Sequence, residues 1–313
     1  MKRLRPGDLR LPPAALRIGI GQLRRYVLNP DLPWDVQRRR LDKFMQAGPS
    51  LRGTTVVKRD LNGIPAEVVT AGDASPRLTV VHFHGGGYCV GSPSMARSWA
   101  ANLSAKTGCQ VILPDYRLAP EHPHPAALDD ARQVMKALGG DLSPDTVVLS
   151  GDSAGGGLAL ALLLALRDEG QELPAGCVLL SPWLDLGANR RRPPDLVRKD
   201  HLLSPRWLEA CAAAYAGSSD LADPAISPLF ATCEGLPPLL IQCGSDEVLA
   251  PDSERLAARA SAARTDVTYT KWPGLWHDFA LQPGILAAAD SALAQTAWFA
   301  GKAIPRPARS REP

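Results

Sequence analysis

The chain has 313 residues, of which 45% are hydrophobic and 21% are charged, and its formal net charge is +3 at pH 7. This length allows a large buried core, either in one domain with an appended cap or in two domains. The net charge is too small to indicate nucleic-acid binding, and the two dense basic spots, residues 38–40 and 190–192, contain no aromatic residues.

The first 50 residues are rich in Arg, Leu and Pro, and Pro13–Val27 and Pro33–Gln46 show helical apolar spacing. From Thr54 onward the pattern changes to strands. Two β-rich runs, Thr54–Leu61 and Ile64–Ala71, flank Asn62-Gly63, which is a strong signal for a tight hairpin turn. We therefore expect N-terminal helices that lie on a sheet opened by an antiparallel hairpin.

After the hairpin, apolar strands alternate with helical stretches. The expected strands are Leu78–Phe83, Gln110–Leu113, Thr146–Ser150, Cys177–Leu180, Leu239–Cys243 and Val267–Trp272. The expected helices are Met95–Lys106, Ala126–Leu138, Ser153–Glu169, Asp252–Ala263 and Ile285–Phe299. Repeated β-α-β units with continuously apolar strands predict an α/β fold, with a mostly parallel central sheet and helices on both faces.

One segment, Leu186–Ile226, is too long for an ordinary connection and contains a helical stretch, Pro205–Tyr215. We interpret it as an insertion that joins the N-terminal helices to form a helical cap. The expected organisation is an N-terminal cap part at residues 1–50, a core at 51–186, an inserted cap segment at 187–226, a second core part at 227–303 and a tail at 304–313.

The cysteines and the apolar runs bear on cofactors and location. Six scattered cysteines without a C-x-x-C pair indicate neither a zinc site nor a disulfide framework. The longest apolar run, Leu158–Leu166, is far shorter than the roughly 18 residues that span a bilayer, and no signal peptide is visible. We expect a cytoplasmic protein with no cofactor, no metal and no stable membrane insertion.

The segment from Gly151 to Gly156 lies directly between a strand and a helix, and it contains the pattern Gly-x-Ser-x-Gly. In this context the pattern predicts a nucleophile elbow, in which Ser153 projects from a strained turn. Gly151 and Gly155 are then needed because side chains there would collide with neighbouring chain. The alternative is an ordinary serine N-cap.

A nucleophilic serine needs a base, and the base needs an orienting carboxylate. His277 follows the last expected strand, at the edge where parallel-sheet active sites form. Asp246 is the first carboxylate after the strand Leu239–Cys243, and we take it as the partner of His277. Its rivals are Glu247, Asp252 and Asp278. The order Ser153, Asp246, His277 is that expected of an α/β-hydrolase.

Hydrolysis also requires donors for a developing oxyanion, and His84-Gly85-Gly86-Gly87 follows a strand where such a loop belongs. The N–H groups of Gly86, Gly87 and Ala154 would form the hole. A dinucleotide site would need a different glycine spacing, and a metal site at His82 and His84 lacks further ligands.

Four separated motifs resemble the bacterial hormone-sensitive-lipase-like esterases, a family of α/β-hydrolases. They are the loop 84–87, Asp115-Tyr-Arg-Leu-Ala-Pro-Glu121, the elbow Gly151-Asp152-Ser153-Ala154-Gly155-Gly156, and Asp223-Pro-Ala-Ile-Ser-Pro228. The resemblance implies catalytic Ser153, Asp246 and His277, a helical cap and a possible homodimer. Glu247 and Asp278 depart from residues often found after the catalytic Asp and His.

The residues and the resemblance together predict a carboxylic-ester hydrolase that forms an acyl-enzyme. Its expected partner is a small hydrophobic ester or lactone with a short-to-medium acyl group. Trp34, Trp183 and Trp207 are candidates for the pocket lining, and packing in the core is the alternative for each of them. Two alternatives stay open. The first is a small-molecule receptor on the same fold, and the second is an amidase that uses the same residues.

Overall fold

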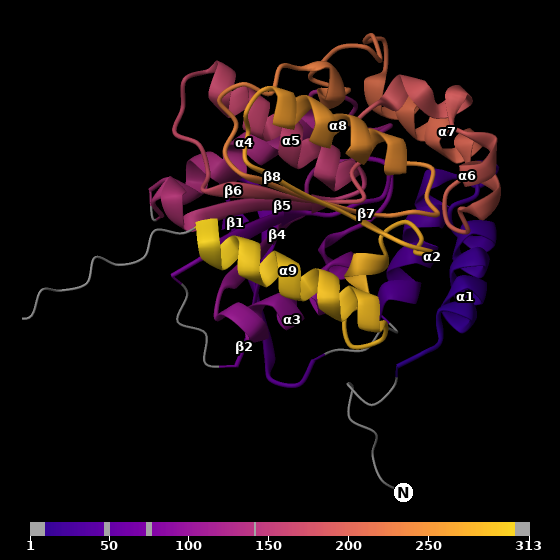
Figure 1. The fold of residues 1–313 in the computed structure, drawn as a ribbon, viewed down its shortest axis with the longest axis horizontal. Coiled ribbons are helices and arrows are strands. Elements are labelled where there is room, and N and C mark those ends of the chain that lie inside the picture. Colours follow the sequence, from indigo (N-terminus) through magenta and orange to yellow (C-terminus); the bar gives the residue numbers. More distant parts are fainter. Residues whose placement is uncertain (1–9, 47–50, 73–76, 141, 304–313) are drawn as a thin grey trace, which may run out of the picture.

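The computed structural model describes residues 10–46, 51–72, 77–140 and 142–303, and within them it contains one eight-stranded sheet (Figure 1). The strands lie in the order β1-β2-β4-β3-β5-β6-β7-β8. Their bounds are β1 (Thr54–Leu61), β2 (Ile64–Ala71), β3 (Thr79–Phe83), β4 (Gln110–Pro114), β5 (Val147–Asp152), β6 (Gly176–Leu180), β7 (Leu239–Gly244) and β8 (Val267–Trp272). The β1–β2 pair is antiparallel, as the hairpin signal predicted, and the β2–β4 pair is also antiparallel. The other pairs are parallel, as the alternation of strands and helices predicted.

The hairpin between β1 and β2 turns at the predicted residues. Asn62 and Gly63 have φ angles of 55° and 86°, which are the left-handed values that a tight two-residue turn requires. The N–H of Gly63 also donates to Oδ1 of Asp60 at 2.8 Å. The turn therefore fixes the register in which Leu61 pairs with Ile64.

The central strands are apolar on both sides because two cores lie against them. Successive side chains point to opposite faces, so Val148 packs in one buried cluster and Leu149 in the other. Helices α3 (Arg97–Thr107) and α9 (Ala287–Ala303) cover one face, while α4 (Ala126–Leu138), α5 (Ala154–Asp168) and α8 (Ala250–Ala262) cover the other (Figure 1). The α/β prediction is confirmed.

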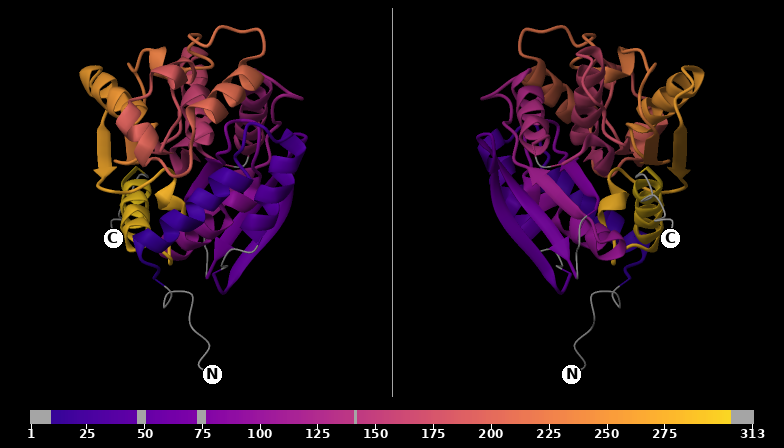
Figure 2. Two further views of the ribbon diagram at one scale, coloured as in Figure 1. Left: turned by 90° about the vertical axis from the view of Figure 1, so that its right-hand side faces the viewer. Right: turned by 90° about the vertical axis from the view of Figure 1, so that its left-hand side faces the viewer.

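The N-terminal helices α1 (Pro13–Tyr26) and α2 (Trp34–Gln46) lie beside the inserted helices α6 (Pro194–Lys199) and α7 (Pro205–Ala216). They face the viewer together in the left panel of Figure 2. The indole N–H of Trp207 donates to Gln37 at 2.9 Å, and Arg24 donates to the carbonyl of Asp200 at 2.9 Å. These contacts join segments that are far apart in the sequence. The short helix α6 is absent from the sequence-based expectation.

Within the described ranges, no helix is both long enough and apolar enough to cross a bilayer. All six cysteines are buried and unpaired. The predicted tail, residues 304–313, lies outside the described residues.

Candidate active site

Ser153 lies at a sharp turn between β5 and α5, and its φ and ψ angles are 53° and −120°. Few residues with a side chain adopt such a conformation, and it points Oγ away from both elements. A Cβ on Gly155 would lie against the carbonyl oxygen of Phe83, and one on Gly151 would lie against that of Gly155, both well inside 3.0 Å. Glycine is therefore required on both sides of the turn, which is the geometry predicted for an elbow.

The hydroxyl of Ser153 meets the imidazole of His277. The distance from Oγ to Nε2 is 2.9 Å, and both side chains are buried. Ser153 follows β5 and His277 follows β8, two strands of the parallel part of the sheet, whose carboxyl ends lie along one edge. The fold thus places a serine and a base, 124 residues apart in sequence, within hydrogen-bonding distance.

The other ring nitrogen of His277 contacts Glu247. Nδ1 lies 3.1 Å from Glu247 Oε2, and this carboxylate is completely buried. Burial raises the pKa of Glu247, and the neighbouring imidazole lowers it in part. An imidazole that donates its Nδ1 proton to Glu247 keeps a lone pair on Nε2 that can accept the Ser153 proton.

Asp246, the predicted partner of His277, lies elsewhere, so that prediction is wrong. Its Oδ2 accepts from Arg17 on α1 at 3.1 Å, and its backbone N–H donates to the carbonyl of Leu275 at 2.9 Å. This backbone bond holds Asp246 against the loop that carries His277, so its side chain leaves the loop toward α1 and the next side chain turns inward. One feature of the sequence favours an inward-facing Glu247, since it directly precedes the apolar pair Val248-Leu249. In the structure this pair is fully buried.

Arg17 links α1 to the loop of His277. One guanidinium nitrogen donates to the carbonyl of Gly274 at 2.6 Å and to Asp246 at 3.1 Å. We expect Arg17→Ala to lower the free energy of unfolding by about 1–2 kcal/mol, because hydrogen bonds from a partly exposed charge are lost. For a chain of this size the melting temperature should fall by about 1.5–3 °C. The control is Arg10→Ala, because Arg10 makes a more exposed ion pair with Asp290. Equal melting temperatures of the two variants in calorimetry would contradict this role of Arg17.

The glycine loop after β3 is tied to the elbow by Asp152. The carboxylate of Asp152 accepts from the N–H of Gly85 at 3.0 Å and contacts Nε2 of His82 at 3.0 Å. Gly86 and Gly87 have φ angles of 113° and 62°, and no hydrogen bond among the described residues uses their N–H groups. These two donors therefore remain available beside the first N–H of α5, which belongs to Ala154.

His84 supports this loop, and no hydrogen bond among the described residues joins its ring to Ser153 or His277. Its Nδ1 donates to the carbonyl of Gly85 at 2.7 Å, and its ring stacks on Tyr116 with a centroid distance of 4.4 Å. The hydroxyl of Tyr116 donates to the carbonyl of His84 at 2.6 Å. Aromatic stacking and two hydrogen bonds thus fix the start of the loop.

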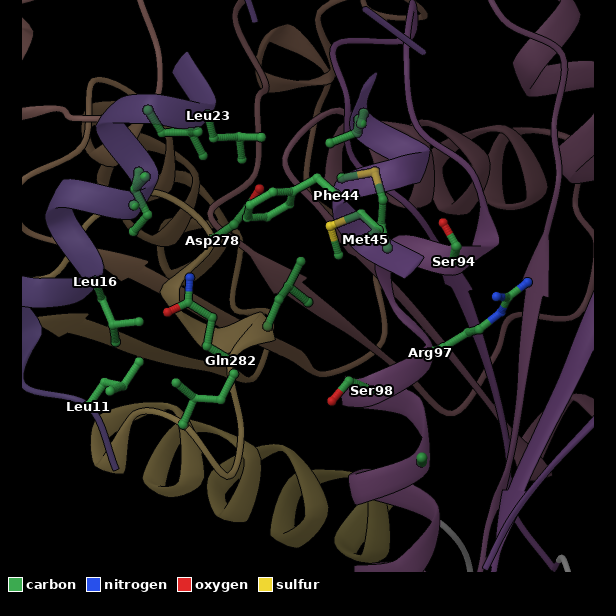
Figure 3. Close-up of a pocket in the computed structure, with 18 of the residues that line it drawn as sticks. Leu11, Leu16, Leu23, Phe44, Met45, Ser94, Arg97, Ser98, Asp278 and Gln282 are labelled. Carbon is green, nitrogen blue, oxygen red and sulfur yellow. The ribbon is translucent and has the colours of Figure 1, made fainter. Parts of the chain in front are cut away.

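A cavity of about 620 Å³ opens beside His277 and is drawn in Figure 3. Leu16 and Leu23 come from α1, Phe44 and Met45 come from α2, and Ser98 comes from α3. The walls are mainly apolar, as is usual for a small-molecule site.

The three tryptophans predicted to line the pocket do not line this cavity. Trp183 and Trp207 are fully buried packing residues, and Trp34 packs against the same core. The packing alternative is therefore the correct one for these tryptophans, and smaller apolar residues of α1 and α2 form much of the wall.

Asp278 is a second carboxylate at the candidate base. Its Oδ2 lies 3.1 Å from Nε2 of His277, the nitrogen that also meets Ser153. Burial raises the pKa of Asp278 to about 7. Burial also opposes the charged form of His277, but Asp278 and Glu247 outweigh it and hold the pKa of His277 well above its ordinary value.

Comparison with known proteins gives consistent results. Residues 80–281 match the model of a protein family that has the α/β hydrolase fold. A putative acetyl-hydrolase of Mycobacterium tuberculosis, LipR, is 37% identical over 78% of this chain and 79% of its own length. An esterase of Acinetobacter venetianus is 37% identical over 94% of this chain and 91% of its own length.

The solved structures that resemble this chain include an esterase from the bacterial hormone-sensitive lipase family. That structure has a TM-score of 0.87 and 34% identity, and the match covers 94% of this chain and all of the other. A hormone-sensitive lipase from a metagenome library matches with a TM-score of 0.88 and 34% identity, over 95% of this chain and all of the other. The chain therefore belongs to the α/β-hydrolase family, among the bacterial hormone-sensitive-lipase-like esterases, and is an enzyme of the esterase and lipase type.

Proposed function

We propose that the protein hydrolyses carboxylic esters through an acyl-enzyme formed on Ser153. The observation that carries the proposal is the continuous contact from Ser153 Oγ to His277 Nε2 and from His277 Nδ1 to Glu247, beside an apolar cavity. A serine hydroxyl becomes nucleophilic when a positioned base removes its proton, and the base works best when a buried carboxylate fixes its tautomer.

The reaction follows from these contacts in two halves. His277 takes the proton of Ser153 as Oγ attacks the ester carbonyl, and it then gives the proton to the leaving alcohol. Glu247 stabilises the imidazolium that forms between these steps. The N–H groups of Gly86, Gly87 and Ala154 receive the negative charge on the carbonyl oxygen. Water, activated by the same imidazole, then releases the acid.

The cavity supports a substrate with an apolar alcohol portion, or an apolar lactone. The leaving oxygen must lie beside Nε2 of His277 to receive its proton, and His277 and Asp278 are at the cavity wall. The alcohol portion would therefore enter the cavity beneath α1 and α2, which cap the site. Two relatives are named acetyl-hydrolases, which supports a short acyl group on this chain's substrate.

The experiment is hydrolysis of ethyl, butyl, hexyl and decyl acetate in a pH-stat. We expect kcat/KM to rise about two- to fourfold per methylene until the cavity is filled, because each buried methylene is worth about 0.8 kcal/mol. A p-nitroanilide of the same acyl group measures amidase activity in parallel. Absence of hydrolysis of every ester by the folded protein would overturn the proposal.

Leu16→Trp tests the assignment of the cavity. Leu16 lines it, so the larger indole should reduce kcat/KM for decyl acetate by about tenfold or more and leave ethyl acetate nearly unchanged. The matched control is Ile18→Trp, because Ile18 lies on the same helix but is 70% exposed and does not line the cavity. If the ratio of kcat/KM for decyl acetate to kcat/KM for ethyl acetate is the same in both variants, the alcohol portion of the substrate lies elsewhere.

The proposal extends to the cellular compartment in which the protein works. All six cysteines are reduced and buried, and burial raises the pKa of Cys177 and Cys243, which makes their thiols unreactive. This arrangement supports a reducing compartment, and we propose the cytoplasm.

A further inference from the structure

Asp278 places a carboxylate beside the reacting atoms, and its charge is uncompensated whenever His277 is neutral, which is the form in which His277 acts as a base. Its Oδ2 lies 3.1 Å from Nε2 of His277, and Ser153 Oγ lies 2.9 Å from that same nitrogen. The other carboxylate oxygen, Oδ1, has no hydrogen-bond partner among the described residues. No described Arg or Lys forms an ion pair with Asp278, so His277 is its one ion-pair partner in this part of the chain.

The charged groups around Asp278 come from several elements. Glu247 follows β7 and contacts the far side of His277, while Asp152 ends β5 and raises the pKa of Asp278 further. At the cavity wall, Arg97 on α3 is paired with Glu67. Arg17 on α1 is paired with Asp246. Both of these cations are therefore already paired with other carboxylates. When His277 is in its neutral, base-competent form, the carboxylates of Asp278 and Glu247 make the field at Nε2 negative.

The last step of ester hydrolysis creates a negative charge at this same place. The attacking water gives its proton to Nε2 of His277, so its oxygen starts beside this nitrogen and ends in the product carboxylate. Water supplies two protons over this step. The proton taken by His277 passes to the oxygen of Ser153 as the ester bond breaks, and the other is released to solvent as the acid ionises to its anion. One oxygen of the product is then next to Nε2 and close to Asp278.

We propose that Asp278 is a specificity-determining residue that rejects anions at the reacting centre, so that the carboxylate product leaves readily and anionic acyl groups are poor substrates. This inference rests on the proposed ester hydrolysis. Like charges held a few ångströms apart in a partly buried site repel strongly, because the local dielectric constant is well below that of water. A neutral ester or lactone feels no comparable repulsion.

The test compares butyrate with butyramide, its neutral analogue of similar shape, as inhibitors of ester hydrolysis. In Asp278→Asn we expect the inhibition constant of butyrate to fall about tenfold or more, while that of butyramide changes little. Asparagine fits the backbone, since Asp278 has a φ of 57°, a left-handed value that Asn tolerates. Asp246→Asn is the matched control, because it removes a carboxylate on the outer side of the neighbouring loop. In this variant we expect the inhibition constants of butyrate and butyramide to stay unchanged.

A pH series adds a readout that a purely structural role would not move. Asp278 loses its proton near its pKa of about 7, so butyrate should inhibit the wild type less as the pH rises through this value. In Asp278→Asn the inhibition by butyrate should no longer weaken in this way as the pH rises. The acid limb of kcat/KM should also move to lower pH, because the Asp278 carboxylate helps to raise the pKa of His277.

The outcomes separate the two proposals. If the wild type hydrolyses no ester, the proposed function fails. If it hydrolyses esters and the ratio of the butyrate and butyramide constants is unchanged in Asp278→Asn, the inference about Asp278 alone is overturned. Should Asp278→Asn fold poorly, Asp278→Gly suits the same backbone angle and gives the same comparison.

Discussion

Replacing Glu247 by glutamine is expected to lower kcat for ester hydrolysis by about 10³–10⁴-fold, whereas Asp246→Asn should keep kcat within a few-fold of the wild type. Glu247 Oε2 holds the Nδ1 proton of His277 at 3.1 Å in a fully buried site. A glutamine can instead donate its amide N–H to Nδ1, which leaves the proton on Nε2 and prevents that nitrogen from accepting the proton of Ser153.

The two carboxylates are adjacent in sequence and differ in size by one methylene, so the pair of amides is a closely matched comparison. Steady-state kinetics on butyl acetate and melting temperatures of both variants are the measurements. Folding must be checked because an uncharged amide in place of a buried acid can change stability. If Asp246→Asn is the inactive variant and Glu247→Gln is active, the contacts of His277 in this structure do not describe the working enzyme.

Replacing Gly155 by alanine is expected to be among the most destabilising single substitutions in the chain. The new Cβ would overlap the carbonyl oxygens of Phe83 and His84, both of them backbone atoms that cannot move without shifting β3 and the glycine loop. Such overlaps cost about 4–5 kcal/mol or more, a large part of a typical stability of about 5–15 kcal/mol. We expect little folded protein at 37 °C.

Gly301→Ala is the control for this prediction. Gly301 also lies in a helix, but a Cβ there would meet no atom within 4 Å. Alanine has the higher helix propensity, so this variant should be at least as stable as the wild type. Urea unfolding followed by circular dichroism compares the two. Free energies of unfolding within about 1 kcal/mol of each other would show that the elbow is not packed as the structure describes.

The fold and most of the site could be predicted because local chemistry specifies them. Asn62-Gly63 adopts left-handed angles that few other pairs tolerate, and the strands buried on both faces read as continuous apolar runs. The positions of Ser153 and His277 follow from the rule that parallel strands end at one edge. These features depend on a few neighbouring residues or on topology alone.

The partner of His277 could not be chosen in this way. Whether Asp246 or Glu247 turns inward depends on the hydrogen bond from Asp246 N–H to Leu275 and on Arg17, which lies 229 residues away in sequence from Asp246. The residues that line the cavity could not be chosen from the sequence for a related reason. The sequence left Trp207 open between pocket lining and core packing, whereas in the structure its indole N–H donates to Gln37 and its ring fills space in the core. Tertiary contacts therefore determine both which carboxylate faces His277 and which residues line the cavity.

The most direct test of the central claim is mass spectrometry of the protein quenched with acid during turnover of p-nitrophenyl butyrate. The account predicts a butyryl group on the peptide that contains Ser153, formed within the initial burst and absent in Ser153→Ala. It also predicts that the acylated fraction decays as substrate is exhausted. Hydrolysis without a modified peptide, or a butyryl group on another residue together with activity in Ser153→Ala, would contradict the acyl-enzyme on Ser153.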